Sequence, residues 1–312
     1  MNIAFFLIED NQRASLEQAF GGHQLFIYRE GLNKKNIREV AKADIIVSRP
    51  LGMELVFDAT TLDKFPNLKF ICTMSTGFDH IDLDYCNQRG IVVSNIPSYA
   101  EDSVAEQTFA LLLSISRKIP QSLASMHQKS FDQQLLRGFE LKNKTIGVIG
   151  SGKIGLAVIR IAQGFGMHVL VYDVVFNEAA QKKLGFSYVE LDELIKKSNI
   201  ISLHAPLTKQ THHLLNDNLK KMKRGGVIIN TARAELIDSE VLIELLNSGQ
   251  IFFAGLDVFE KDYLGSLLET KKVFITLHNG ANTVEAKELV LRETIKTVRS
   301  FLDKRVNNVV NL

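Results

Sequence analysis

The chain is poor in cysteine, with only two, Cys72 and Cys86, among its 312 residues. Two cysteines supply neither a disulfide framework nor a metal-ligand set, so we expect no metal site and a cytoplasmic location. Cys72 lies in an apolar strand-like run and Cys86 in a polar helical one. We expect both to be small core or half-buried thiols.

Excess charge and long apolar runs are also missing. The formal net charge is +2, which gives no electrostatic basis for binding nucleic acid or a membrane surface. No apolar run reaches the roughly 20 residues that a membrane span needs. The N-terminus has no basic region and turns acidic at Glu9, so we expect a first β-strand there and no signal peptide. The length suggests about two domains.

A glycine-rich turn joins an apolar strand to a helix in the middle of the chain. Residues 145–149 form an apolar strand-like run, glycines follow at 150, 152 and 155, and a helical apolar pattern comes next. In such a turn Gly150 permits the tight bend, Gly152 lets the backbone approach a pyrophosphate, and Gly155 lets the helix pack close to the strand. The N–H groups of the helix N-terminus suit the phosphates. This arrangement predicts a bound dinucleotide.

Asp173 ends the next strand and indicates which dinucleotide binds. A carboxylate there accepts hydrogen bonds from the adenosine ribose and repels a 2′-phosphate. Val174 and Val175 follow where an NADP site usually has arginine. The sequence therefore predicts NAD as the cofactor. The predicted cofactor-binding residues of this segment are Gly150, Ser151, Gly152, Lys153, Ile154 and Asp173.

Strand-like and helix-like segments alternate along the whole chain, which predicts parallel sheets covered by helices on both faces. The expected strands are 2–8, 24–28, 44–48, 68–74, 91–94, 145–149, 168–172, 199–203, 226–230, 251–257 and 273–276. Long helical patterns span 102–117 and about 284–302, and the stretch 118–143 is polar and irregular. We predict an α/β protein with two doubly wound, parallel-sheet, Rossmann-like domains and a cleft between them. Ligands should bind beyond the carboxyl ends of the strands.

Charged side chains follow three of the later strands. Arg233 comes after 226–230, carboxylates come at and after the end of 251–257, and His278 comes after 273–276. A histidine titrates near neutral pH, so His278 suits the base that takes a proton when a secondary alcohol gives up a hydride. A guanidinium holds a carboxylate bidentately, which suits Arg233. The alternatives stay open at this point, because Arg233 could be a surface residue and His278 could simply satisfy backbone groups.

Several motifs taken together resemble the D-isomer-specific 2-hydroxyacid dehydrogenase family. Besides the glycine motif, the resemblance rests on residues 75–82 (STGFDHID), 95–97, 104–106, 204–208 (HAPLT), 230–233 (NTAR), 255–259 (GLDVF) and 278–281 (HNGA). These motifs follow the family's order and cover nearly the whole chain.

The resemblance implies a discontinuous substrate domain, residues 1–98 plus 285–312, and an NAD-binding domain, residues 99–284. It implies that Arg233 and His278 are catalytic and that the helix at 102–117, with the loop after it, forms the arm of a homodimer. The implied substrate-binding residues are Thr76, Gly77 and Phe78, through their N–H groups, and Tyr99. The further implied cofactor-binding residues are His204, Pro206, Thr231 and Asp257, the last at the nicotinamide amide.

The chain departs from the family pattern around the expected active site. Asp262 stands where the family has the glutamate that pairs with the histidine, and its side chain is one methylene shorter. We expect Asp262 as the partner of His278, with Glu260 as the alternative. Leu277 replaces the proline that usually precedes the histidine, which leaves the backbone there less restrained.

The favoured function is NAD-dependent interconversion of a D-2-hydroxy acid and its 2-oxo acid. The segment around Tyr99 favours a substrate like lactate or pyruvate. Hydroxypyruvate, glycerate or phosphoglycerate are the alternatives, because Arg49 follows an early strand and could meet a second anionic group or make only a salt bridge. Two alternatives belong to a different functional class: an NADH-sensing, corepressor-like protein and an inactive binding protein. The presence of both Arg233 and His278 argues against a sensor.

Overall fold

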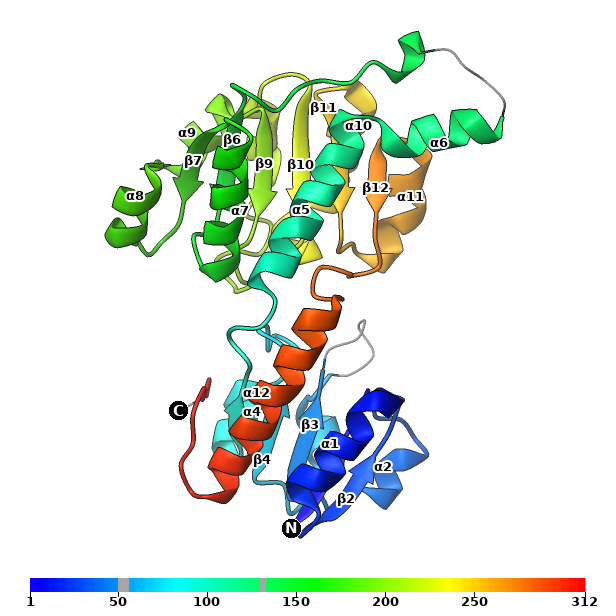
Figure 1. Cartoon of the computed structure of the whole chain (residues 1–312), viewed down its shortest axis with the longest axis vertical. Helices are drawn as coiled ribbons and strands as arrows, with labels where there is room; N and C mark the ends of the chain where they lie inside the picture. The colour runs from blue at the N-terminus through cyan, green and yellow to red at the C-terminus, as the bar shows by residue number, and fades with distance from the viewer. Residues whose placement is uncertain (50–55, 129–132, 312) are drawn as a thin grey trace. The chain divides into compact units, whose positions relative to one another are not determined.

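The computed structural model describes residues 1–49, 56–128 and 133–311. The chain divides into two compact units, the first made of Met1–Tyr99 and Thr283–Leu312, the second of Ala100–Asn282 (Figure 1). The first unit is therefore discontinuous in sequence. Its ends lie one and two residues from the expected boundaries at residues 98 and 285.

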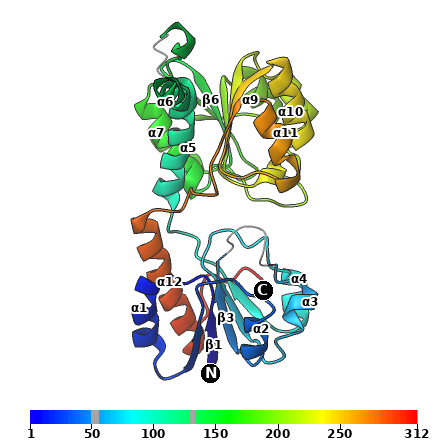
Figure 2. The same ribbon diagram turned by 90° about the vertical axis from the view of Figure 1, so that its right-hand side faces the viewer.

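The first unit is built on a five-stranded parallel sheet with the order β2-β1-β3-β4-β5. Its strands are β1 (Asn2–Phe5), β2 (Gln24–Ile27), β3 (Ile45–Ser48), β4 (Phe70–Thr73) and β5 (Val92–Ser94). Its helices are α1 (Asp10–Phe20), α2 (Asn36–Glu39), α3 (Ala59–Leu62), α4 (Leu83–Gln88) and α12 (Val284–Leu302). Helices α1 and α12 cover one face, and α2, α3 and α4 lie on the other (Figure 2). Alternate strand residues supply the two cores, since Ile3 and Phe5 pack in one cluster and Ala4 in the other.

The second unit is built on a seven-stranded parallel sheet with the order β12-β11-β10-β9-β6-β7-β8. Its strands are β6 (Thr145–Ile149), β7 (His168–Tyr172), β8 (Ser187–Tyr188), β9 (Ile200–Leu203), β10 (Gly226–Asn230), β11 (Ile251–Leu256) and β12 (Val273–Ile275). The chain runs outward from β6 to β8 and then crosses back to β9, on the other side of β6. The strand order therefore reverses beside β6, which is where ligands bind in sheets of this kind.

Helices cover both faces of the second sheet (Figure 2). One face carries α5 (Glu101–Ser116), α7 (Lys153–Gly164) and α8 (Glu178–Leu184), and the other carries α9 (Leu191–Lys197), α10 (Ser239–Ser248) and α11 (Leu264–Glu269). Short 3-10 turns lie between these elements at η3 (Asp217–Lys221), η4 (Ala234–Leu236) and η5 (Lys261–Tyr263). The predicted fold class, two doubly wound parallel-sheet units, is confirmed.

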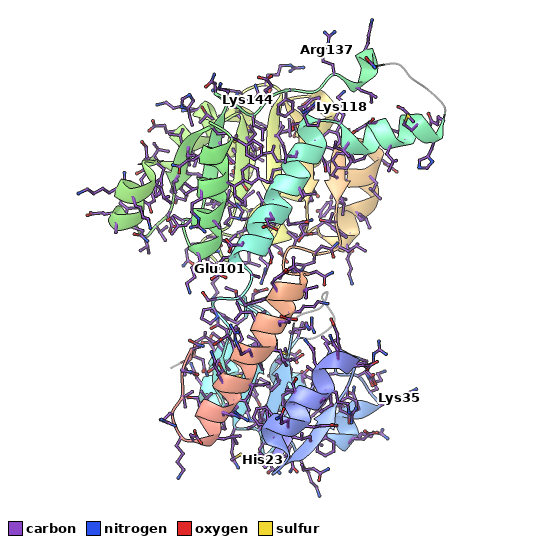
Figure 3. The ribbon with its side chains drawn as sticks, in the orientation of Figure 1. His23, Lys35, Glu101, Lys118, Arg137 and Lys144 are labelled. Carbon is purple, nitrogen blue, oxygen red and sulfur yellow. The ribbon has the colours of Figure 1, made fainter. Side chains whose placement is uncertain are left out.

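The stretch expected to be irregular contains a helix. Helix α6 spans Ile119–His127, and a 3-10 turn, η2, spans Gln134–Leu136. Lys118, with a left-handed φ of 52°, separates α5 from α6 (Figure 3). Pro120 sits in the first turn of α6, where its missing N–H is tolerated. Residues 129–132, part of the loop expected in a dimer arm, lie outside the described residues.

Both cysteines are free and buried, Cys72 on β4 and Cys86 on α4. Burial raises the pKa of Cys72 to about 12 and that of Cys86 to about 11, so neither thiol ionises near neutral pH. Over the described ranges, no group of three His, Cys, Asp or Glu side chains is placed to hold a metal ion. No helix in the described part of the chain has both the length and the apolar character of a membrane span.

Gly155 allows α7 to pack directly on the turn that precedes it. A Cβ at this position would lie 2.0 Å from the carbonyl oxygen of Gly150, a distance that no side chain tolerates. Gly164, at the other end of the same helix, has open space around the position of a Cβ. The close approach is therefore specific to the glycine-rich turn.

We predict that Gly155→Ala lowers the unfolding free energy of the second unit by about 1–3 kcal/mol, as overpacking does elsewhere. Gly164→Ala is the matched control in the same helix and should be neutral or stabilising by up to about 1 kcal/mol. Differential scanning calorimetry measures both changes. Equal midpoints for the two variants would contradict the packing argument.

Candidate functional site

The predicted site residues of the second unit lie along one edge of its sheet. Because all paired strands are parallel, their carboxyl ends meet at the same edge. The residues that leave the strands there are Gly150 to Ile154 after β6, Asp173 after β7, His204 and Pro206 after β9, Thr231 and Arg233 after β10, Asp257 after β11, and His278 after β12. The structure thus brings these predicted residues to one edge.

The glycine turn is shaped to admit a phosphate group. Gly150 has φ 96°, and a Cβ there would lie 2.7 Å from the backbone of His204 and Ala205. Gly152 is the N-cap of α7, and the position of its missing Cβ has nothing within 4 Å. Among the described residues, no side chain caps the first turn of α7, and no acidic residue lies in that turn. An open helix N-terminus of this kind suits a pyrophosphate.

Asp173 lies beside that turn at the end of β7. Its Oδ2 accepts hydrogen bonds from the backbone N–H and the hydroxyl of Ser151, at 2.5 and 2.9 Å. Its Oδ1 accepts one from the N–H of Val175 at 3.0 Å. Val174 and Val175 are exposed, so no cation stands directly after the carboxylate. The Asp173 carboxylate, an acceptor, suits the ribose hydroxyls of NAD, which would donate to it, and would repel a 2′-phosphate.

His204 is held at the end of β9 by its backbone and its ring. Its N–H donates to the carbonyl of Ile149 at 2.7 Å, and its Nε2 lies 2.8 Å from the hydroxyl of Ser202. Nδ1 is buried and has no partner among the described residues. Burial lowers the pKa of His204 to about 3, so the ring is neutral at physiological pH. The next predicted residue, Pro206, accepts a hydrogen bond from the Thr211 hydroxyl at 2.7 Å.

The turn that carries Arg233 is fixed by a buried asparagine. Asn230, the last residue of β10, donates through Nδ2 to the carbonyl of Arg233 at 2.8 Å and accepts through Oδ1 from the N–H of Ala232 at 3.0 Å. The guanidinium itself donates to the carbonyl of Ala232 at 2.8 Å. The hydroxyl of Thr231 is hydrogen-bonded to the hydroxyl of Thr108 on α5, with 3.0 Å between the two oxygens. The sequence prediction missed Asn230, although a polar residue ending an apolar strand is a usable signal.

Asp257 fixes the loop that carries His278. This carboxylate is 1% exposed. It accepts hydrogen bonds from the N–H groups of Asn279 and Gly280, both at 2.8 Å, and from the hydroxyl of Thr276. The Asp257 carbonyl also accepts from the N–H of His278 at 2.9 Å. The loop is therefore bound to one residue on both sides of the histidine.

The backbone of this loop is strained at His278. His278 has a left-handed φ of 53°, which is uncommon for a residue with a side chain. A Cβ on Gly280 would lie 3.1 Å from Oδ2 of Asp257, so a larger residue would push the carboxylate away. Strain of this kind persists only where surrounding contacts hold it, and Asp257 supplies them.

The two carboxylates expected as partners of His278, Glu260 and Asp262, follow β11 in the chain. Glu260 accepts a hydrogen bond from the Ser239 hydroxyl at 2.6 Å. Asp262 is exposed on η5. The pairing of His278 with Asp262 or Glu260 therefore stays a prediction.

The remaining predicted residues belong to the first unit. The hydroxyl of Thr76 donates to the carbonyl of Ile96, and Asn95 donates to the carbonyl of Thr76, at 3.2 and 2.7 Å. Ser75 donates to the carbonyl of Gly77 at 2.6 Å. These contacts use carbonyl groups, and no described residue accepts from the N–H groups of Thr76, Gly77 or Phe78. A loop whose N–H groups remain available suits a carboxylate ligand.

Tyr99 and Arg49 lie on neighbouring parts of the first unit. Tyr99 packs on the core that α1 and α12 share with the sheet. Arg49 donates to the carbonyl of Leu7 at 2.9 Å and lies 3.9 Å from a carboxylate oxygen of Glu9. Glu9 is also paired with Lys287 of α12. The salt-bridge alternative for Arg49 is therefore present in the structure.

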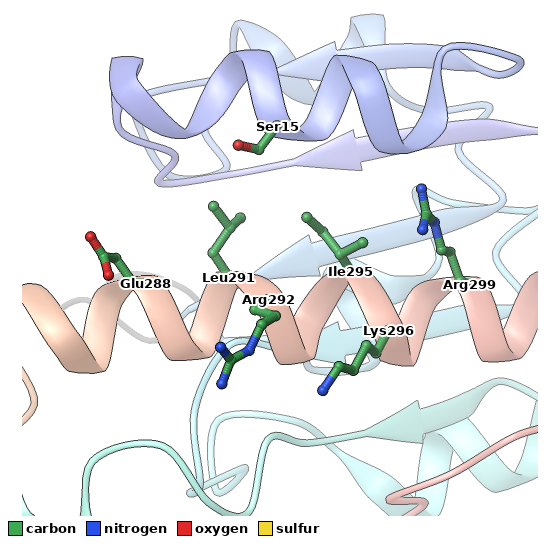
Figure 4. A pocket seen from close by; sticks show the side chains of 7 residues that line it. All are labelled: Ser15, Glu288, Leu291, Arg292, Ile295, Lys296 and Arg299. Carbon is green, nitrogen blue, oxygen red and sulfur yellow. The ribbon is translucent and has the colours of Figure 1, made fainter.

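A shallow hollow of about 450 Å³ lies between α1 and α12 (Figure 4). Leu291 and Ile295 form its apolar part, and Arg292, Lys296 and Arg299 surround them. None of the predicted site residues lines it.

Comparison with known proteins points to one family. A family model described as "D-isomer specific 2-hydroxyacid dehydrogenase, NAD binding domain" matches residues 109–280. The chain is 35% identical over 292 residues to a glyoxylate reductase of Thermococcus litoralis, across 90% of this chain and 86% of that protein. It is 37% identical over 291 residues to a D-3-phosphoglycerate dehydrogenase of Methanocaldococcus jannaschii, across 90% of this chain and 55% of that protein. The structure of a D-lactate dehydrogenase from Aquifex aeolicus, complexed with NAD and lactic acid, aligns with a TM-score of 0.91 and 35% identity, covering 100% of this chain and 99% of that one.

The buried, neutral ring of His204 predicts acid sensitivity. The unfolded chain takes up this proton near pH 6.5, and the folded chain only near pH 3, so stability is complete above pH 6.5 and falls as the pH drops toward 3. Between pH 7 and pH 5 the wild type should lose about 1–2 kcal/mol more unfolding free energy than His204→Gln. Urea titrations at the two pH values measure this difference. The control is His212→Gln, which changes an exposed histidine and should lose as much unfolding free energy between the two pH values as the wild type does. An equally large loss in His204→Gln would refute the prediction.

Proposed function

The chain belongs to the D-isomer-specific 2-hydroxyacid dehydrogenase family, an NAD-dependent family, and we propose that it reduces a small monoanionic 2-oxo acid such as pyruvate to the D-2-hydroxy acid. The observation that carries the proposal is the edge of the second sheet, where Arg233 follows β10 and His278 follows β12 on loops held by Asn230 and Asp257. The first unit would be the substrate domain, expected at residues 1–98 plus 285–312, and the second the NAD-binding domain, expected at residues 99–284.

The proposed mechanism assigns each group a separate task. When bound, NADH supplies the hydride. His278 donates a proton from its ring to the carbonyl oxygen as that oxygen becomes a hydroxyl, and Asp262 or Glu260 would orient the ring. Arg233 binds the substrate carboxylate and polarises the carbonyl through the same planar group. The N–H groups of Thr76, Gly77 and Phe78 hold the carboxylate, and Tyr99 contacts the substrate side chain.

Each group of predicted cofactor residues is assigned to one part of the NAD molecule. The glycine turn, with Ser151, Lys153 and Ile154, would take the pyrophosphate, and Asp173 the adenosine ribose. His204, Pro206 and Thr231 would line the cofactor site, and Asp257 would meet the nicotinamide amide. The Asp257 carboxylate has about four acceptor positions and uses three within the loop, so one is left for that amide.

A small substrate is favoured by the charges around Arg49. The carboxylate of Glu9 lies near Arg49 and pairs with Lys287. Its negative charge therefore partly neutralises the two cations that a substrate phosphate would need. The similarity to a lactate-bound D-lactate dehydrogenase supports the same choice. Glyoxylate or hydroxypyruvate is the second candidate, because the glyoxylate reductase of Thermococcus litoralis is equally similar in sequence.

We predict that the purified protein oxidises NADH with pyruvate at a higher kcat/KM than with glyoxylate, hydroxypyruvate or 3-phosphohydroxypyruvate. His278→Gln should lower kcat by roughly 10²–10⁴-fold, because it removes the proton donor. Arg233→Ala should lower kcat/KM by at least about 10²-fold, because it removes a charge-assisted contact to the carboxylate. Both are measured by the loss of NADH absorbance.

His212→Gln is the control for the loss of an exposed histidine ring, and it should retain full activity. Full turnover by His278→Gln would refute the assignment of the proton donor. A clear preference for the phosphorylated acid would refute the choice of substrate and leave the family assignment unaffected.

Helix α6 supports a homodimer. Ile119, Leu123 and Met126 are 56%, 60% and 57% exposed and recur at helical spacing, which gives α6 an uncovered apolar face. A second copy of the chain would cover this face, as the arm predicted from the family implies. The two free, buried cysteines support a cytoplasmic location for this assembly.

We predict a dimer mass by light scattering for the wild type, and a monomer for Leu123→Glu, which places a charge in the apolar face. Ala124→Glu, on another side of the same short helix, is the matched control and should remain dimeric. A monomeric wild type at micromolar concentration would contradict this part of the proposal.

A further inference from the structure

Four residues form a continuous hydrogen-bonded chain next to the glycine turn. The N–H of Asn177 donates to the hydroxyl of Tyr188 at 3.0 Å. That hydroxyl lies 2.8 Å from the hydroxyl of Ser151, which in turn lies 2.9 Å from Oδ2 of Asp173. Tyr188 belongs to the two-residue strand β8, which the sequence did not predict.

The chemistry of the groups fixes the direction of every bond in this chain. A backbone N–H only donates, and a carboxylate only accepts. Ser151 has a single hydroxyl proton and uses it on Asp173, so the bond between the two hydroxyls is donated by Tyr188. The protons therefore all point from Asn177 toward Asp173. Bonds aligned in this way polarise and strengthen one another.

The rest of the surroundings hold Tyr188 in this position. Its ring stacks on Phe176 with centroids 4.6 Å apart and meets Phe186 edge-on at 5.1 Å. Ser151 is 6% exposed, so its hydroxyl has little access to water as an alternative partner. The Tyr188 hydroxyl is thus the donor that the Ser151 oxygen depends on.

The chain of bonds determines how Asp173 is presented. A carboxylate has about four acceptor positions, and here Ser151 takes two on Oδ2 and Val175 takes one on Oδ1. The remaining position is on Oδ1. A carboxylate that cannot rotate presents this position in one direction.

We propose that Tyr188 is a positioning residue for cofactor specificity, acting through Ser151 to orient Asp173 toward the ribose of NAD and against the 2′-phosphate of NADP. This proposal rests on the proposed role of Asp173 at the ribose. It assigns to Tyr188 a part in cofactor choice without contact with the cofactor. Removal of the hydroxyl weakens the binding of NADH and leaves the already poor binding of NADPH nearly unchanged.

The test is Tyr188→Phe, which keeps the stacked ring and removes only the hydroxyl. Calorimetric titration should show the Kd for NADH rising by roughly 3–10-fold, the ratio that corresponds to one hydrogen bond, and the Kd for NADPH changing by less than about 2-fold. When Tyr188→Phe is added to Ser151→Ala, the Kd for NADH should stay almost the same as in Ser151→Ala alone. The single change has already removed the hydroxyl that connects Tyr188 to Asp173. Tyr28→Phe, which loses a hydroxyl contact to Glu39 in the first unit, is the matched control.

Three results separate the possible failures. If Tyr188→Phe weakens NADH and NADPH equally, or lowers the thermal midpoint without changing their ratio, Tyr188 is structural and the proposal is wrong. If it changes neither Kd, the proposal is also wrong. Asp173→Asn tests the underlying assignment separately: an unchanged ratio of the two Kd values in that variant would refute the role of Asp173 itself.

Discussion

The buried carboxylate of Asp257 is the interaction on which the arrangement at the sheet edge depends. It lies after the end of β11 and accepts hydrogen bonds from Thr276, Asn279 and Gly280 in the loop after β12, so the loop that carries His278 is bound to the neighbouring strand end. An ionised group at 1% exposure is unfavourable unless several donors meet it. The same donors fix His278 in a backbone conformation that it would not adopt unaided.

The other functional loops of the second unit follow the same physical pattern. Asn230 binds the turn that presents Arg233, and Asp173 is bound to the turn of the glycine motif through Ser151. In each case a polar side chain at a strand end satisfies backbone groups of a nearby loop. Reactive side chains are thereby carried on short, fixed loops, and catalysis gains from groups that need no rearrangement.

Much of this organisation can be read from the sequence, because it depends on local patterns. The strand at 145–149, the glycines and the acid at 173 form one continuous signal, and α12 begins and ends where its apolar pattern does. Helix α6 was missed because it is short and begins at a proline turn, and β8 because two residues show no alternation. The contacts of Asp257 with Gly280 and of Tyr188 with Ser151 join residues far apart in the chain, so no periodicity reveals them.

The most direct test of this account is amide hydrogen exchange at Asn279 and Gly280 in the wild type and in Asp257→Asn. Loss of the ionised acceptor should speed exchange at both amides by roughly 10–100-fold, the ratio expected for hydrogen bonds to a charged group. The amides of β10 should exchange as before, and Asp217→Asn, which removes an exposed carboxylate of η3, should change neither loop amide. Unchanged exchange at Asn279 and Gly280 in Asp257→Asn would show that the loop of His278 is held by something other than this carboxylate.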